Sequence, residues 1–199
     1  GVTVRAQSLL EDARNADAVI VGSGIHTREI VQRPELMQRL ALDPGRQLLA
    51  AQGSGTLVLA TLGLLDQVPA CTDLTTKPWV QDAGIRVLDQ PFCASGNVAT
   101  AGGCLAAPYL AAWIIARSEG IDAAEAALHY VAPVGGKASY VANALRNISP
   151  YLPAGTRAAP RRSRLRDSRL RRRRHPWPAG PAATSTPLGI GPIAGGAMS

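Results

Sequence analysis

The stretch QLLAAQGSGTLVLATLGLLD, residues 47–66, changes from one periodicity to another at its first glycine. The apolar run 48–51 is short and continuous, as is typical of a buried strand. Over residues 54–62 apolar side chains recur at helical spacing, so a helix follows at once. The chain must therefore turn sharply at Gly53. Turns of this kind often carry a nucleophile at their apex, and glycine has no side chain to supply one.

The segments before this turn show the same alternation of strand and helix. The run DAVIVG, residues 17–22, leads into Gly-Ser-Gly, a pattern that favours a buried parallel strand delivering a loop at its carboxyl end. The stretch RPELMQRLALD, residues 33–43, has Pro34 at a first helical position and predicts a helix. The sequence thus predicts an α/β fold with a ligand site at the carboxyl edge of its strands.

The second half of the domain departs from this alternation. We expect CTDLTTKPW, residues 71–79, to form a short strand and a turn, and residues 84–103 to form an antiparallel hairpin around Ala-Ser-Gly-Asn. Residues 104–120 predict a long apolar helix. Because Pro108 would cost about 3 kcal/mol inside a helix, this helix either begins after Cys104 or is kinked. We expect Cys104 to be a small buried helix residue.

The last helices and the end of the domain are marked by capping and composition. Asp122 and Glu125 have capping-box spacing ahead of an apolar run, and residues 138–148 predict a final helix. We therefore expect one domain over residues 1–153. Residues 154–199 are rich in Arg, Pro and Gly and lack apolar periodicity, so they cannot offset their ordering entropy and are predicted to be a disordered tail.

The charge of the chain is divided unevenly between these two parts. The 199 residues carry a net charge of +7, but residues 1–153 hold 11 basic and 13 acidic residues, a balance of −2, and the tail holds 10 basic residues and one acidic. The domain therefore has no basic footprint for nucleic acid, which we do not expect as a partner. The alternative is a nucleic-acid-associated protein that binds phosphate through the Arg-rich tail.

The composition also limits the compartment and the cofactors. No secretory leader and no apolar run long enough to cross a bilayer is present, so we expect a soluble cytoplasmic protein without membrane contact. The three cysteines lack the paired spacing of a metal site and the even count of a disulfide framework. We predict neither a metal nor a cofactor.

Four blocks of the chain, taken in order, resemble the DJ-one/PfpI superfamily, which has the class I glutamine amidotransferase fold. The blocks are DAVIVGSG (17–24), LLAAQGSGTLVLATLGLLD (48–66), TDLTTKPW (72–79) and GNVATAGGCLAAPYLAAWIIA (96–116). The resemblance covers residues 1–153 and implies a flavodoxin-like three-layer sandwich with a mainly parallel sheet. It further implies a homodimer, and a first strand and helix that would precede Gly1.

The resemblance also assigns the catalytic positions, and this chain departs from them. In that superfamily the strand-to-helix turn reads A-x-C-x-G, and the cysteine is the nucleophile of hydrolases and lyases acting on small electrophiles, such as the isonitrile hydratase and PfpI-type branch. The matching position here is Gly53, which keeps the turn and removes the thiol. Lys77 stands where many members have a histidine, and the acidic partner would precede Gly1. The resemblance therefore implies a pseudoenzyme.

Ser54 and the loop after the first predicted strand supply the remaining candidates. Ser54 follows the apex and is predicted to be a helix N-terminal serine and not a nucleophile. The resemblance makes the N–H groups of Gly24 and Ser54 donors to an oxyanion. Ser23, His26 and Thr76 are further pocket candidates. Two function classes stay open: an impaired hydrolase or lyase with a small-molecule substrate, and a non-catalytic protein that binds a small anion or a partner.

Overall fold

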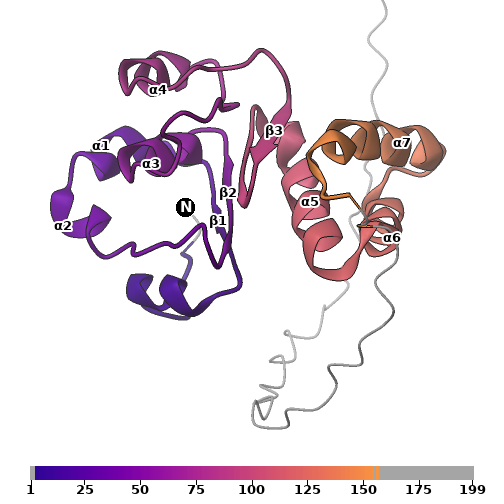
Figure 1. Ribbon diagram of the computed structural model, residues 1–199, viewed down its shortest axis with the longest axis horizontal. Helices are drawn as coiled ribbons and strands as arrows, with labels where there is room; N and C mark the ends of the chain where they lie inside the picture. Colours follow the sequence, from indigo (N-terminus) through magenta and orange to yellow (C-terminus); the bar gives the residue numbers. More distant parts are fainter. Residues whose placement is uncertain (1–2, 155, 157–199) are drawn as a thin grey trace, which may run out of the picture. The chain divides into compact units, whose positions relative to one another are not determined.

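A four-stranded, mainly parallel sheet forms the centre of the domain. The computed structural model describes residues 3–154 and 156, so the predicted tail lies almost wholly outside the described residues. The strand order is β1-β2-β4-β3, in which β1, β2 and β4 are parallel and β3 is antiparallel to β4 (Figure 1). The strands are β1 (Ala18–Val21), β2 (Leu48–Gln52), β3 (Phe92–Ser95) and β4 (Val98–Ala101).

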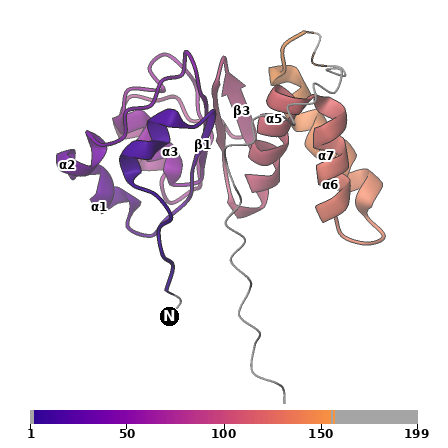
Figure 2. The same ribbon diagram turned by 90° about the horizontal axis from the view of Figure 1, so that it is seen from below.

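Helices cover both faces of this sheet, as Figure 2 shows. One face carries α1 (Thr27–Val31), α2 (Pro34–Met37), α3 (Gly55–Thr61) and α4 (Lys77–Asp82). The other carries α5 (Ala107–Glu119), α6 (Ile121–Val131) and α7 (Lys137–Ile148). Short 3-10 turns are η1 (Leu10–Asn15), η2 (Cys104–Ala106) and η3 (Ser149–Tyr151). The arrangement of helices on both faces of a mainly parallel sheet confirms the flavodoxin-like α/β fold. No helix in the described part of the chain could span a lipid bilayer.

Two hydrophobic cores lie on opposite faces of the sheet, and β2 contributes to both. Ala50 belongs to the core beneath α5–α7, whereas Leu49 and Ala51 belong to the core beneath α3 and α4. Because alternate residues of a strand point to opposite faces, a strand covered on both sides is apolar throughout. The parallel strand predicted from residues 17–22 is present as β1. Its predicted burial is wrong, because β1 is an edge strand of the described sheet and leaves Ile20 54% exposed.

The predicted strand over residues 71–79 is also wrong. A parallel bridge between Ala70 and Val87 lies just before this segment, and the chain then turns into the helix α4. The Asp73 carboxylate accepts hydrogen bonds from the N–H and the hydroxyl of Thr76, and Pro78 occupies the first helical turn. This local capping overrides the strand preference of the threonines.

The hairpin and the long helix after it agree with the sequence. Strands β3 and β4 pair around a turn in which Gly96 has a φ of 57°. Helix α5 begins at Ala107, which places Pro108 in the first turn, so of the two alternatives the later start is correct. Cys104, predicted to be a buried helix residue, lies instead in η2 and is exposed.

The predicted capping box before α6 does not form. Helix α6 already begins at Ile121, with Gly120 as its N-cap and no side-chain cap. Asp122 therefore lies inside the first turn of α6. Its negative charge interacts favourably with the helix dipole there, but its side chain does not cap the helix.

Candidate functional site

A sharp turn joins β2 to α3 at the carboxyl edge of the sheet. Its apex, Gly53, has a φ of 54°, in the left-handed region that glycine adopts without strain. The Gly53 N–H donates to the carbonyl of Ala101 at the end of β4, with an N···O distance of 2.8 Å. The turn predicted from the sequence is therefore present, and it is anchored to the neighbouring strand.

The second glycine of the turn brings the helix against the end of β1. A Cβ atom placed on Gly55 would lie 2.3 Å from the carbonyl oxygen of Val21, well inside the contact distance of two atoms. Because the obstacle is backbone, no side-chain rotation could relieve it. Gly55 thus allows the close approach that sets the loop after β1 beside this turn between β2 and α3, which we call the elbow.

The hydroxyl of Ser54 fills the space between the elbow and this loop. Ser54 is 6% exposed, and its Oγ accepts the Gly24 N–H at 2.9 Å. The same Oγ lies 3.1 Å from the hydroxyl of Ser23 and 2.9 Å from that of Thr27. None of these partners is a histidine or a carboxylate, so the geometry supplies no base to activate a serine nucleophile.

The two N–H groups expected to hold an oxyanion already have acceptors in the chain. The Gly24 N–H donates to Ser54 Oγ, and the Ser54 N–H donates over 3.4 Å to Ser23 Oγ. An anion would have to displace these hydroxyls before it could bind here. The hydroxyl network therefore occupies the expected oxyanion site.

A cavity of about 390 Å³ opens beside the elbow. It is lined by five of the residues that sequence reasoning selected, namely Ser23, Gly24, Gly53, Ser54 and Thr76. His26 is not among its lining residues: its Nδ1 lies 2.9 Å from Glu29 Oε2, and its side chain is 68% exposed. The loop after β1 thus contributes backbone and hydroxyl groups to the cavity and turns its imidazole outward.

Two charged side chains that sequence reasoning missed also line this cavity. Asp73 Oδ2 lies 3.3 Å from the position of a Cβ on Gly53, and the guanidinium of Arg28 lies 4.7 Å from the centre of the Trp79 ring. The spacing of Asp73 and Thr76, three residues apart before a helix, is a capping signal that could have identified the carboxylate. No signal in the sequence links Arg28 to Trp79.

Cys104 brings a thiol to the rim of the cavity. It is the exposed cysteine of the described chain, whereas Cys71 and Cys93 are buried. A hydrogen bond to Cys93, together with burial, raises the pKa of the Cys71 thiol above its ordinary value. Cys71 is therefore a protonated core residue, and Cys104 is the thiol that a ligand in the cavity could meet.

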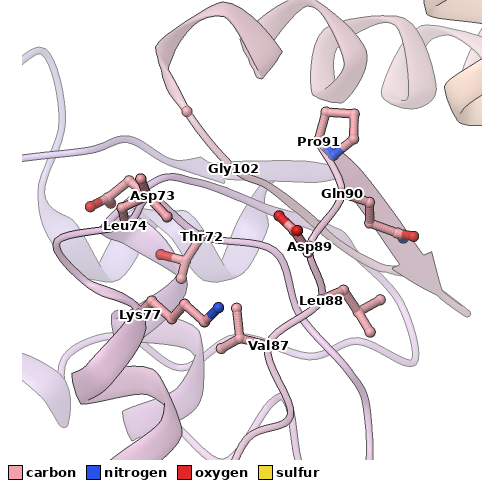
Figure 3. A pocket seen from close by; sticks show the side chains of 11 residues that line it. Thr72, Asp73, Leu74, Lys77, Val87, Leu88, Asp89, Gln90, Pro91 and Gly102 are labelled. Atoms are coloured by element: carbon pink, nitrogen blue, oxygen red, sulfur yellow. The ribbon is translucent and has the colours of Figure 1, made fainter.

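Lys77 faces a different cavity. It is the first residue of α4 and lines a neighbouring space of about 400 Å³, together with Asp89, as Figure 3 shows. It does not line the cavity beside Gly53. The position that the resemblance assigned to the catalytic histidine thus lines a different cavity from the one beside Gly53.

Comparison with known proteins finds similarity in structure alone. No family model matches the chain, and no curated protein does. The VC2308 protein is 19% identical over 71% of this chain and 74% of its own, with a TM-score of 0.56. A mutant of the DJ-1 superfamily protein STM1931 from Salmonella typhimurium is 19% identical over 76% and 74% of the two chains, with a TM-score of 0.49.

Schizosaccharomyces pombe DJ-1 is 20% identical to this chain, with a TM-score of 0.40. The match covers 67% of this chain and 64% of that protein, so this chain spans less than two thirds of its length. At such identities a likeness shows the fold alone. The chain therefore has the α/β fold of the VC2308 protein, and its structural neighbours include proteins of the DJ-1 (DJ-one) superfamily.

Proposed function

We propose that this chain is a DJ-1/PfpI superfamily protein that binds a small molecule in the cavity beside Gly53 without attacking it from the elbow. The observation that carries the proposal is the apex itself, where glycine leaves no side chain. The adjacent hydroxyl, on Ser54, is buried and bonded to the loop after β1. The other class, a cysteine-dependent hydrolase or lyase such as an isonitrile hydratase, needs a nucleophile at this apex.

The ligand that fits the lining is a small molecule that joins a carboxylate to an apolar group. Within residues 3–154 Arg28 forms no salt bridge, so its guanidinium is free to hold a carboxylate through two parallel hydrogen bonds. The ring of Trp79 supplies apolar surface beside it. The nearby carboxylate of Asp73 already accepts two hydrogen bonds from Thr76, which disperse its charge.

A matched pair of ligands tests the binding part of the proposal. We expect the full chain to bind benzoate more tightly than benzamide, its uncharged counterpart, in calorimetric titrations. Arg28→Met should weaken benzoate binding at least tenfold, since it removes both charged hydrogen bonds to the carboxylate, and should leave benzamide binding unchanged. Arg33→Met is the control, because Arg33 pairs with Glu35 and does not line the cavity. Equal binding of the two ligands by the unaltered chain would contradict the proposal.

An activity assay tests the non-catalytic part. We expect no turnover when the purified chain is incubated with an isonitrile, methylglyoxal or a simple amide. Turnover that disappears in Ser54→Ala would make that serine a nucleophile despite its bonded hydroxyl. Turnover that disappears in Cys104→Ser would assign the chemistry to the thiol at the rim. Either result would overturn the view that this site only binds.

A further inference from the structure

The cavity that contains Lys77 is a second concave site, which shares Asp73 and Gly103 with the cavity beside Gly53. It lies between the start of α4 and residues 87–91, which lead into β3 (Figure 3). The second wall is fixed by the bridge between Ala70 and Val87 and by the hydrogen bond from the Leu88 N–H to the Ala70 carbonyl, at 2.9 Å. A volume of about 400 Å³ is in the range of small-molecule sites.

Opposite charges from the two walls reach this space. The ammonium of Lys77 comes from α4, and the carboxylate of Asp89 comes from the facing segment (Figure 3). Within residues 3–154 neither side chain takes part in a salt bridge. Lys77 as a whole is half-buried. Both groups are thus free to form charged hydrogen bonds with a ligand.

Apolar side chains lie beside these charges. Leu74 is 87% exposed, and Val87 and Leu88 are half-buried. All three line the cavity. A ligand with an aliphatic group would cover this surface, and the removal of both apolar surfaces from water would stabilise the complex. The site therefore offers one ammonium, two carboxylates and an apolar patch within a single cavity.

We propose that this cavity binds a small zwitterion with an aliphatic side chain, of the class of free amino acids. Its carboxylate pairs with Lys77, its ammonium pairs with Asp89, and its side chain covers Leu74. A zwitterion is favoured over a simple anion because Asp73 and Asp89 both line the cavity and outnumber the one lysine. A simple amine would leave the Lys77 ammonium unpaired.

Three ligands of nearly the same shape test this proposal. They are L-leucine, isocaproate, which lacks the ammonium, and isoamylamine, which lacks the carboxylate. We expect the full chain to bind L-leucine saturably in calorimetric titrations, and to bind each analogue about tenfold more weakly, because each lacks one charged hydrogen bond. The Arg-rich tail would favour isocaproate, so a preference for L-leucine points to the cavity.

Variants of the two charges locate the binding. Lys77→Met should weaken L-leucine binding about tenfold and abolish the preference over isoamylamine, and Asp89→Asn should abolish the preference over isocaproate. Asp82→Asn, at the exposed end of α4, is the matched control. Amide resonances of Lys77 and of residues 87–90 should shift on titration. Unchanged thermal midpoints of the variants would exclude unfolding as the cause of lost binding.

The outcomes separate this proposal from the one about the elbow. Arg28 lines the cavity beside Gly53 and not the cavity of Lys77, so Arg28→Met should leave L-leucine binding unchanged. If L-leucine binding is lost in Arg28→Met and retained in Lys77→Met, the amino acid binds at the elbow and this proposal is wrong. Absence of saturable binding, or equal binding of L-leucine and isocaproate, also overturns it.

Discussion

The elbow and the cavity of Lys77 are neighbours, yet they use their polar groups in opposite ways. At the elbow the Ser54 hydroxyl accepts the Gly24 N–H, so these groups satisfy each other. In the neighbouring cavity Lys77 and Asp89 have no salt-bridge partner among residues 3–154. Buried groups that pair within the chain contribute to folding, whereas unpaired groups at a cavity are available to a ligand. Substitutions at the elbow should therefore reduce stability, and substitutions at Lys77 should reduce binding alone.

Gly55→Ala should have the largest effect on stability. Its new methyl group would lie 2.3 Å from the Val21 carbonyl oxygen, and relief requires α3 to move away from β1. We expect a loss of about 3 kcal/mol in the free energy of unfolding, measured by urea denaturation. Gly22→Ala is the control, because a Cβ there meets nothing within 4 Å. Equal losses in the two variants would show that the close approach at Gly55 is unimportant.

Ser54→Ala should lower the free energy of unfolding by less, about 2 kcal/mol, because it leaves the Gly24 N–H without its acceptor in a part-buried site. The same denaturation experiment measures it. Ser118→Ala, at an exposed serine whose hydroxyl bonds to the Ile114 carbonyl, should cost less than about 0.5 kcal/mol. If Ser54→Ala were as mild as this control, the hydroxyl network would not be holding the loop to the elbow.

Gly53→Cys should cost about 1 kcal/mol, because an L-residue is strained at a φ of 54°. It also tests the chemistry of the apex. Asp73 Oδ2 lies 3.3 Å from the new Cβ, and a neighbouring carboxylate disfavours the thiolate and raises the pKa of the thiol. In a Cys104→Ser background, alkylation by iodoacetamide at neutral pH should therefore be slow, and Asp73→Asn should accelerate it. Equal alkylation rates with and without the carboxylate would contradict this account.

Lys77→Met should have the smallest effect on stability, within about 0.5 kcal/mol, because no salt bridge is lost among the described residues. Thermal unfolding of the variant and of the unaltered chain measures the difference. A loss as large as that expected for Ser54→Ala would reveal a stabilising partner of Lys77 within the protein. Lys77 would then contribute to folding as Ser54 does, and the contrast between the elbow and the cavity of Lys77 would be wrong.

The amino-acid sequence by itself determined the features that depend on near neighbours in the chain. The apolar run of β2 and the helical spacing after it predicted the turn, and its glycine adopts the positive φ that only glycine tolerates easily. The hairpin of β3 and β4 and the position of Pro108 at the start of α5 followed from equally local rules. The strand predicted within residues 71–79 and the capping box predicted at Asp122 and Glu125 are wrong, because capping at Asp73 and the entry into α6 at Ile121 are competing local signals that prevailed.

Only the tertiary structure decided which side chains share a cavity. Thr76 and Lys77 are adjacent in the sequence, but one step along a helix turns the side chain by about 100°, and the two residues line different cavities. The pairing of Ser54 with Gly24 joins residues 30 positions apart, and the position of Arg28 over Trp79 likewise depends on how α1 and α4 lie against α3. A sequence specifies such contacts only through the packing of whole elements, so periodicity and spacing along the chain could not have identified them.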